Sequence, residues 1–377
     1  MIDTVCLLIP LDQCVFMDKD NKEIPNWDMH SKTENYQKFI RNPTKADKAT
    51  GMYFPRITLF KRRYEQFQNV KIEFSAPKLL YDNNLEELNN ADFNRMVDVL
   101  LDRLKRMGVR LFRHSILNAK VSAIHYSKNI LLTDGYTASH LISELGKIDL
   151  RKSFDFARAR FINDGQSLCA HTTSHELVIY DKIADLNKGK KRAIDRDQTP
   201  YQTSLFGELK GRKQLIEILR FEIRLCKREK INSLFKKLGY EPNLTFKQMF
   251  NSFISQKVVG HYWERIINAK NNGLFTLPIS SKDLLRELYK AQPDIKPNRA
   301  LYLVGLTTLA KDGNGLRELR TILTGKSNDR TWYRIIADHR ELAESISKDR
   351  VRDWVYQIDE GIKKYEPITR SIYEIAV

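Results

Sequence analysis

The chain has 377 residues, of which 42% are hydrophobic and 29% are charged. This size and composition are typical of a soluble protein with two domains. No apolar run approaches the roughly 18 residues of a membrane-spanning helix, and no signal-peptide pattern opens the chain, so we expect a cytoplasmic protein without a membrane partner. The net charge of +17 predicts a polyanionic partner, and nucleic acid more than a lipid surface, although a merely basic protein has the same balance.

The four cysteines are widely separated, which is typical of reduced, structural thiols. Cys169 lies close to His171 and His175 in the sequence. No second pair of ligands completes a tetrahedral zinc set, so a chance cluster in a loop is the simpler interpretation.

Strands and helices alternate in the first half of the chain. Alternation of apolar and polar residues predicts strands at 4–11, 53–61, 70–75 and 119–125, and three- and four-residue apolar spacing predicts helices at 91–107 and 137–145. Gly108 provides a C-terminal stop for the first of these helices. The segments at 61–63 and 188–192 are strongly basic, and the second lies in a long polar insert that we interpret as a surface loop.

Residues 177–183 alternate like a strand, and we predict that the chain is organised around them. Leu177, Ile179 and Ile183 would share a packed face, and Tyr180 and Lys182 would share the other.

A second strand is predicted at residues 219–225, with Arg220, Glu222 and Arg224 on its polar face. A phenol opposite a carboxylate and two guanidiniums suits nucleophilic attack on a phosphodiester, with Lys182 stabilising the phenolate and Glu222 holding a divalent metal. An ordinary antiparallel pair with a charge-paired, solvated face has the same pattern.

Helical spacing dominates after residue 230. The pattern predicts helices at 231–238, 246–255, 282–290 and 298–310, followed by 315–323 and 329–336. The last two enclose a short turn, and Arg330 and Arg334 follow it, which is the outline of a helix-turn-helix as well as of any αα-hairpin. We therefore predict an α+β fold, with an antiparallel sheet domain at 1–240 and a helical domain at 241–377 that binds DNA or another partner.

Four segments resemble, in the same order, the gene II/X family of phage and plasmid replication proteins. They are the first five residues, the block at 72–85 and the strands at 177–182 and 219–225. The resemblance covers about the first 240 residues. It implies an HUH-like, Rep-type nicking-endonuclease core, in which a tyrosine opens one strand of a replication origin.

The resemblance assigns roles to individual residues. Tyr180 falls on the family's nucleophile and Lys182 on its accompanying lysine, while Arg220, Glu222 and Arg224 fall on its arginine–glutamate strand. The family's Ser-Pro-x-Lys block reads Ser-Ala-Pro-Lys here, and it keeps the DNA-contacting lysine as Lys78.

A metal site is also expected. Family members tend to have an aspartate where this chain has His125, so this histidine is either a substituted metal ligand or a structural residue. Carboxylate and imidazole ligands suit Mg²⁺ or Mn²⁺, and we predict a set of Glu222, His125 and Glu73.

The predicted function is a rolling-circle replication initiator that nicks an origin through a 5′-phosphotyrosine and later rejoins the strand. Its partners would be single-stranded and duplex origin DNA, with a host helicase and polymerase. The alternatives are a conjugative relaxase and an origin-binding protein without catalytic activity.

Overall fold

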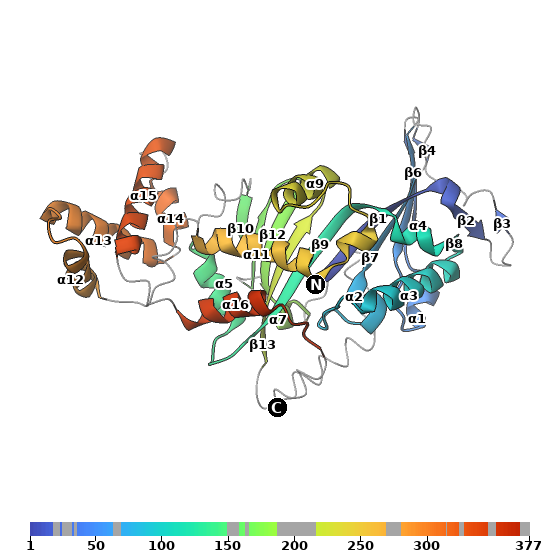
Figure 1. Ribbon diagram of the computed structural model, residues 1–377, viewed down its shortest axis with the longest axis horizontal. Helices are drawn as coiled ribbons and strands as arrows, with labels where there is room; N and C mark the ends of the chain where they lie inside the picture. The colour runs from blue at the N-terminus through green and yellow to red at the C-terminus, as the bar shows by residue number, and fades with distance from the viewer. Residues whose placement is uncertain are drawn as a thin grey trace.

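The computed structural model describes residues 1–17, 23–24, 32–33, 36–62, 69–148, 158–162, 166–186, 216–268, 280–313, 315–323, 328–345 and 352–369. Within these ranges, a 10-stranded sheet has the order β10-β11-β12-β13-β9-β1-β7-β6-β5-β4 (Figure 1). All of its neighbouring strands are antiparallel. The expected α+β class with a large antiparallel sheet is therefore confirmed.

The strands of the large sheet are β1 (Ile2–Pro10), β4 (Lys32–Thr33), β5 (Tyr36–Arg41), β6 (Arg56–Arg62), β7 (Asn69–Ser75), β9 (Lys120–Leu132), β10 (Arg158–Ile162), β11 (Ser167–His171), β12 (His175–Asp181) and β13 (Glu217–Leu225). A smaller sheet has the order β3-β2-β8 and contains β2 (Cys14–Met17), β3 (Glu23–Ile24) and β8 (Val109–Leu111). Short helical segments lie at η1 (Leu11–Gln13), α1 (Lys45–Ala49), α2 (Ala76–Tyr81), α4 (Arg113–Leu117) and α7 (Lys182–Leu186).

One face of the large sheet packs against helices. These are α3 (Asp92–Arg106), α5 (Ala138–Gly146), α9 (Arg228–Lys237), α10 (Phe246–Met249), α11 (Ser252–Asn268) and α16 (Asp353–Lys364). Alternation sends Phe221 and Tyr126 to this face, where both are fully buried. The ring of Phe221 meets Trp263 of α11 edge-on, with 5.5 Å between ring centroids. The opposite face of β13 is thereby left for polar side chains.

Helix α3 is an example of how the local sequence determines the buried face of a helix and the residue at which it ends. Its apolar residues recur at helical spacing and are buried, whereas charged residues such as Arg95, Asp98 and Lys105 are exposed on the other side. The helix ends at Arg106, and Gly108 follows with a φ of 79°, a conformation that glycine adopts without strain. The predicted helix at 91–107 with its glycine stop is confirmed.

The C-terminal helices divide into two groups. Helices α12 (Ser281–Ala291), α13 (Pro297–Lys311), α14 (Gly315–Ile322) and α15 (Asp329–Ser345) form a bundle at one end of the molecule (Figure 1). A separate apolar cluster lies inside this bundle, made of Leu284, Leu288, Ala300, Leu303, Val304 and Leu342. Helices α10, α11 and α16 instead belong to the core of the large sheet, so that core continues beyond residue 240.

Two further observations bear on the predictions. Strand β12 ends at Asp181 and Lys182 begins α7, so the predicted extension of this strand to residue 183 is wrong. A helix begins at Lys182 because the side chain of Asp181 accepts a hydrogen bond from the backbone N–H of Ala184, 2.9 Å away, and so caps its first turn. Among the described helices, none has the length and apolar character to cross a membrane.

Candidate active site

Three adjacent strands, β12, β13 and β9, place polar side chains on one face of the large sheet. Residues directly opposite one another in an antiparallel pair point to the same side. The register forms the rows Tyr180–Arg220–Asn129, Val178–Glu222–Ser127 and Glu176–Arg224–His125. The first two rows are buried and the third is half-exposed, so the site opens toward the third row. The predicted pairing of the two central strands is confirmed.

Tyr180 lies near the end of β12 and points at Glu222. Its hydroxyl donates a hydrogen bond to Oε2 of Glu222 over 3.1 Å. Burial raises the pKa of Tyr180 well above its ordinary value of 10; the positive charge of Arg220 opposes this shift and the negative charge of Glu222 adds to it. The phenol is therefore neutral at physiological pH, with a carboxylate already placed to accept its proton.

Glu222 is the most heavily shared group of the site. Its Oε1 atom lies 2.9 Å from Nε of Arg224 and 3.3 Å from Nδ1 of His125. Burial alone would raise the pKa of Glu222, but the charge of Arg224 and the hydrogen bond from His125 outweigh it and hold the pKa well below 4.5. This carboxylate stays ionised although the residue is only 1% exposed.

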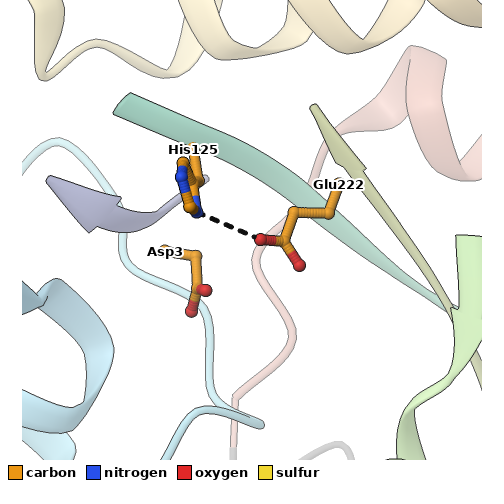
Figure 2. A group of neighbouring side chains, drawn as sticks. All are labelled: Asp3, His125 and Glu222. Carbon is orange, nitrogen blue, oxygen red and sulfur yellow. Dashed lines mark ion pairs between the residues drawn. The ribbon is translucent and has the colours of Figure 1, made fainter. Parts of the chain in front are cut away.

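Asp3 completes a group of potential metal ligands with His125 and Glu222. One ligand atom from each of the three residues lies within 4.8 Å of the others. Figure 2 shows the three side chains, which come from β1, β9 and β13, gathered at one point of the sheet. Burial would raise the pKa of Asp3, but the charge of Arg220 outweighs it and the pKa lies below 3.8.

The spacing and chemistry of this group fit a divalent cation. Ligand atoms that bind one ion at about 2.0–2.6 Å lie at most about 5 Å apart, which is compatible with the observed separation. Two carboxylates and one imidazole suit Mn²⁺, and the carboxylates also suit Mg²⁺. Glu222 has two oxygens, so a cation can share this residue with Arg224 and Tyr180.

The two arginines of β13 have different environments. Arg220 is 1% exposed, and its guanidinium lies 3.0 Å from Oδ1 of Asp3 and donates to Ser127 and Asn129 over 2.9 and 3.0 Å. It is therefore placed to orient a carboxylate of the site, and it is not presented to solvent as a DNA-contacting residue would be. Arg224 is half-exposed and bridges Glu222 and Glu176, whose Oε2 is 3.2 Å away.

The remaining predicted residues lie around or away from this group. Lys182 is buried at the start of α7, with its Nζ atom 5.7 Å from the centroid of the Tyr180 ring. Glu73 on β7 pairs with Lys71 over 3.1 Å and does not belong to the three-residue group. Lys78 is 6% exposed within α2, so it also is not presented to solvent.

Of the basic residues predicted to contact DNA, Arg330 and Arg334 lie outside the site. Arg330 and Arg334 are exposed on α15, in the C-terminal bundle. Residues 63 and 188–192 lie outside the described residues.

The sequence cluster of one cysteine and two histidines does not converge on one point. Cys169 and His171 share the polar face, with 3.9 Å between Sγ and Nδ1, whereas the register places His175 on the opposite face beside Leu225. Nδ1 of His175 lies 3.0 Å from the hydroxyl of Thr172. Within the described ranges, the group formed by Asp3, His125 and Glu222 is the only set of three candidate ligands.

Asp3 is the site residue that sequence reasoning missed. The predicted first strand began at residue 4, although the observed strand β1 begins at Ile2. Alternation continued backward from Val5 would have put Asp3 on the same face as Val5, but an irregularity in the pairing of β1 with β9 between Ile2 and Val5 shifts this phase. The aspartate lies within one of the four segments that carry the family resemblance.

Comparison with protein-family models, with curated proteins and with solved structures finds no match to this chain.

Proposed function

We propose that this protein is a metal-dependent DNA strand transferase that nicks one strand of a replication origin and later rejoins it. The observation that carries the proposal is the 3.1 Å hydrogen bond between the hydroxyl of Tyr180 and Glu222, a member of the candidate metal-ligand group. A nucleophile, a proton acceptor and metal ligands thus lie within one patch of a rigid sheet. The resemblance to the gene II/X replication proteins supports the same reaction and an HUH-like core.

In the proposed reaction, the hydroxyl oxygen of Tyr180 attacks the scissile phosphorus. A bond forms between the tyrosine oxygen and phosphorus, and the bond from phosphorus to the 3′ oxygen breaks. The phenolic proton leaves toward Oε2 of Glu222, and the departing 3′ oxygen takes up a proton to become a hydroxyl. The products are a 5′-phosphotyrosine and a 3′-hydroxyl that a polymerase can extend.

The pKa values of Tyr180 and Glu222 do not favour proton transfer between them, so the reaction needs a further group that stabilises the phenolate. The pKa of Tyr180 lies well above 10 and that of Glu222 well below 4.5, so the isolated pair keeps the proton on the phenol. A divalent cation bound at Asp3, His125 and Glu222 would polarise the phosphate and favour the phenolate. Arg220 holds Asp3 in position for this role, and Arg224 lies at the half-exposed rim, where an incoming phosphate can meet its guanidinium.

A covalent intermediate suits a task in which the broken strand must be rejoined. The phosphotyrosine conserves the energy of the phosphodiester, and a later 3′-hydroxyl can attack it and release Tyr180. A conjugative relaxase would use the same step on a different DNA substrate, and a non-catalytic origin-binding protein would not cleave.

The first test is cleavage of a fluorescent single-stranded DNA library of random sequence in the presence of MnCl₂. We expect the wild-type protein to yield cleaved strands and a denaturation-resistant protein–DNA adduct, both abolished by EDTA. Tyr180→Phe removes the nucleophilic oxygen and should lower cleavage about a thousandfold or more. Tyr136→Phe, which alters a half-buried tyrosine away from the site, should behave like the wild type.

Two results would overturn the proposal. Retained cleavage in Tyr180→Phe would exclude this tyrosine as the nucleophile. Binding of the library without cleavage by the wild type would instead support the non-catalytic origin-binding alternative.

A further inference from the structure

Helix α15 has a basic face that is exposed on the surface of the C-terminal bundle. Its buried side consists of Trp332, Ile336, His339 and Leu342, which recur at helical spacing. The opposite side consists of Arg330, Tyr333, Arg334, Ala337 and Arg340, all exposed, and these five residues are called the α15 face below. The helix is thus buried on one side and exposed on the other.

The acidic residues near this face are already ion-paired. Arg299 of α13 lies 2.6 Å from Oδ1 of Asp338 and 2.6 Å from Oε2 of Glu341. The other oxygen of Asp338 accepts a hydrogen bond from the hydroxyl of Tyr302 over 3.0 Å. Arg299 balances one of these two negative charges, and the three arginines of the α15 face outnumber the one that remains, so the charge around the face is positive.

The major groove of duplex DNA, about 12 Å wide, admits an α-helix. With a rise of about 1.5 Å per residue, Arg330 and Arg340 lie about 15 Å apart along the axis of α15. Arg334 lies between them, and the small side chain of Ala337 allows close approach of the backbone. Guanidinium groups bind phosphate oxygens and the edge of guanine in a bidentate manner.

Helix α13 packs against the buried side of α15 and holds it in this orientation. The hydroxyl of Thr307 on α13 lies 3.2 Å from Nδ1 of His339 on α15. The guanidinium of Arg320 on α14 lies 5.6 Å from the centroid of a Trp332 ring, on the side of α15 away from the α15 face.

We propose that the α15 face binds double-stranded DNA, with α15 in the major groove. The inference rests on the proposed function in taking DNA as the substrate, and it assigns duplex recognition to a surface separate from the nicking site. A membrane surface fits less well because the face contains no large aliphatic side chain. A single strand fits less well because only one aromatic ring is available for base stacking.

The test measures the affinity of three variants for random-sequence duplex DNA by fluorescence anisotropy, over a range of salt concentrations. The first is Arg330→Gln/Arg334→Gln/Arg340→Gln. The control is Arg95→Gln/Lys105→Gln/Arg110→Gln, which removes the same charge from exposed positions outside the bundle. The third replaces the three arginines of the α15 face by lysine and retains the charge.

We expect the glutamine variant of the α15 face to lose two to three phosphate contacts, which flattens the slope of log affinity against log salt by about 2–3. The control should keep a slope close to the wild type, and the lysine variant should retain most of it. Cleavage of the single-stranded library should be unchanged in all three. Equal loss in the control, or an unaltered slope in the α15 variant, would overturn the inference.

Different results would contradict the nicking proposal and the duplex-binding inference. If duplex binding depends on the α15 face while the wild type cleaves nothing, the nicking proposal fails and this inference stands. If cleavage is intact and the α15 variant loses affinity for anionic phospholipid vesicles but not for duplex DNA, the DNA inference is wrong.

Discussion

At the centre of the site, Glu222 is shared by side chains from three strands. Tyr180 donates to one oxygen, His125 contacts the other, and Arg224 donates to both. The charges of Arg224 and Arg220, together with the hydrogen bond from His125, outweigh the cost of burial and keep the pKa of Glu222 low. An ionised carboxylate held at this depth is suited to bind a divalent cation beside the phenol.

Replacement of Glu222 tests its role in metal binding. Glu222→Gln keeps the size of the side chain and removes its charge. We therefore expect the affinity for Mn²⁺ to fall by about tenfold to a hundredfold. Isothermal titration with MnCl₂ measures this change. Glu73→Gln is the matched control, because Glu73 was a predicted ligand but pairs with Lys71. Equal weakening by both substitutions, or none by Glu222→Gln, would argue against the Asp3, His125 and Glu222 set.

The sequence predicted part of this constellation for clear physical reasons. Period-two alternation fixed the faces of Tyr180, Arg220, Glu222 and Arg224, because one side of each strand had to be apolar. It gave no information on which strand lies next to β13. The neighbouring strand β9 contributes His125, and this pairing joins segments about 100 residues apart, which local patterns do not encode.

At the level of elements, long periodic segments were predicted better than short ones. The strands β7 and β13 and the helices α3, α12 and α13 lie within a few residues of their expected limits. The prediction missed strands β5, β10 and β11, which lie toward the edges of the sheet, and helix α16. Residues 246–255 were predicted as one helix, but the chain forms α10 and then α11, with Phe250 at a non-helical ψ of 74° between them.

Glu87 joins three separate segments behind the site. Its carboxylate accepts hydrogen bonds from Nζ of Lys128 on β9 and from the backbone N–H of Ile368, and it lies 3.9 Å from the amino group of Met1. Burial alone would raise the pKa of Glu87, but the charge of Lys128 outweighs it and the pKa lies below 4.5. The contact fastens the segment after α16 to the sheet.

Replacement of Glu87 should therefore have a pH-dependent effect on stability. Glu87→Gln leaves Lys128 buried without its partner charge, and we expect the free energy of unfolding at neutral pH to fall by about 3 kcal/mol. Folding lowers the pKa of Glu87, so its contribution is complete above the unfolded value near 4.5 and is lost as the pH falls through the folded value. The difference between wild type and variant should narrow in acid.

Urea unfolding over a range of pH measures this effect. Glu241→Gln, at an exposed loop position, is the control and should change stability by less than about 0.5 kcal/mol. A difference between Glu87→Gln and wild type that stayed constant, or grew, as the pH fell below 4.5 would contradict the assigned direction of the pKa shift.

At the level of the whole molecule, the chain combines a sheet core with an inserted helical bundle. The predicted boundary at residue 240 separated strands from helices by their order in the sequence, but α10, α11 and α16 share the core of the sheet. Composition gave no sign that α16 returns to the sheet after the bundle. The net charge of +17 suggested a polyanionic partner, and we propose two separate DNA-binding surfaces, one at the proposed nicking site and one on the α15 face.

The central claim is that Tyr180 becomes covalently attached to DNA. The most direct measurement is mass spectrometry of tryptic peptides after incubation with the single-stranded library and MnCl₂, followed by nuclease digestion. We predict a nucleotide adduct on the peptide that contains Tyr180, attached through its phenolic oxygen. An adduct on Tyr126, Tyr136 or Tyr201, or cleaved DNA without any adduct, would contradict the account.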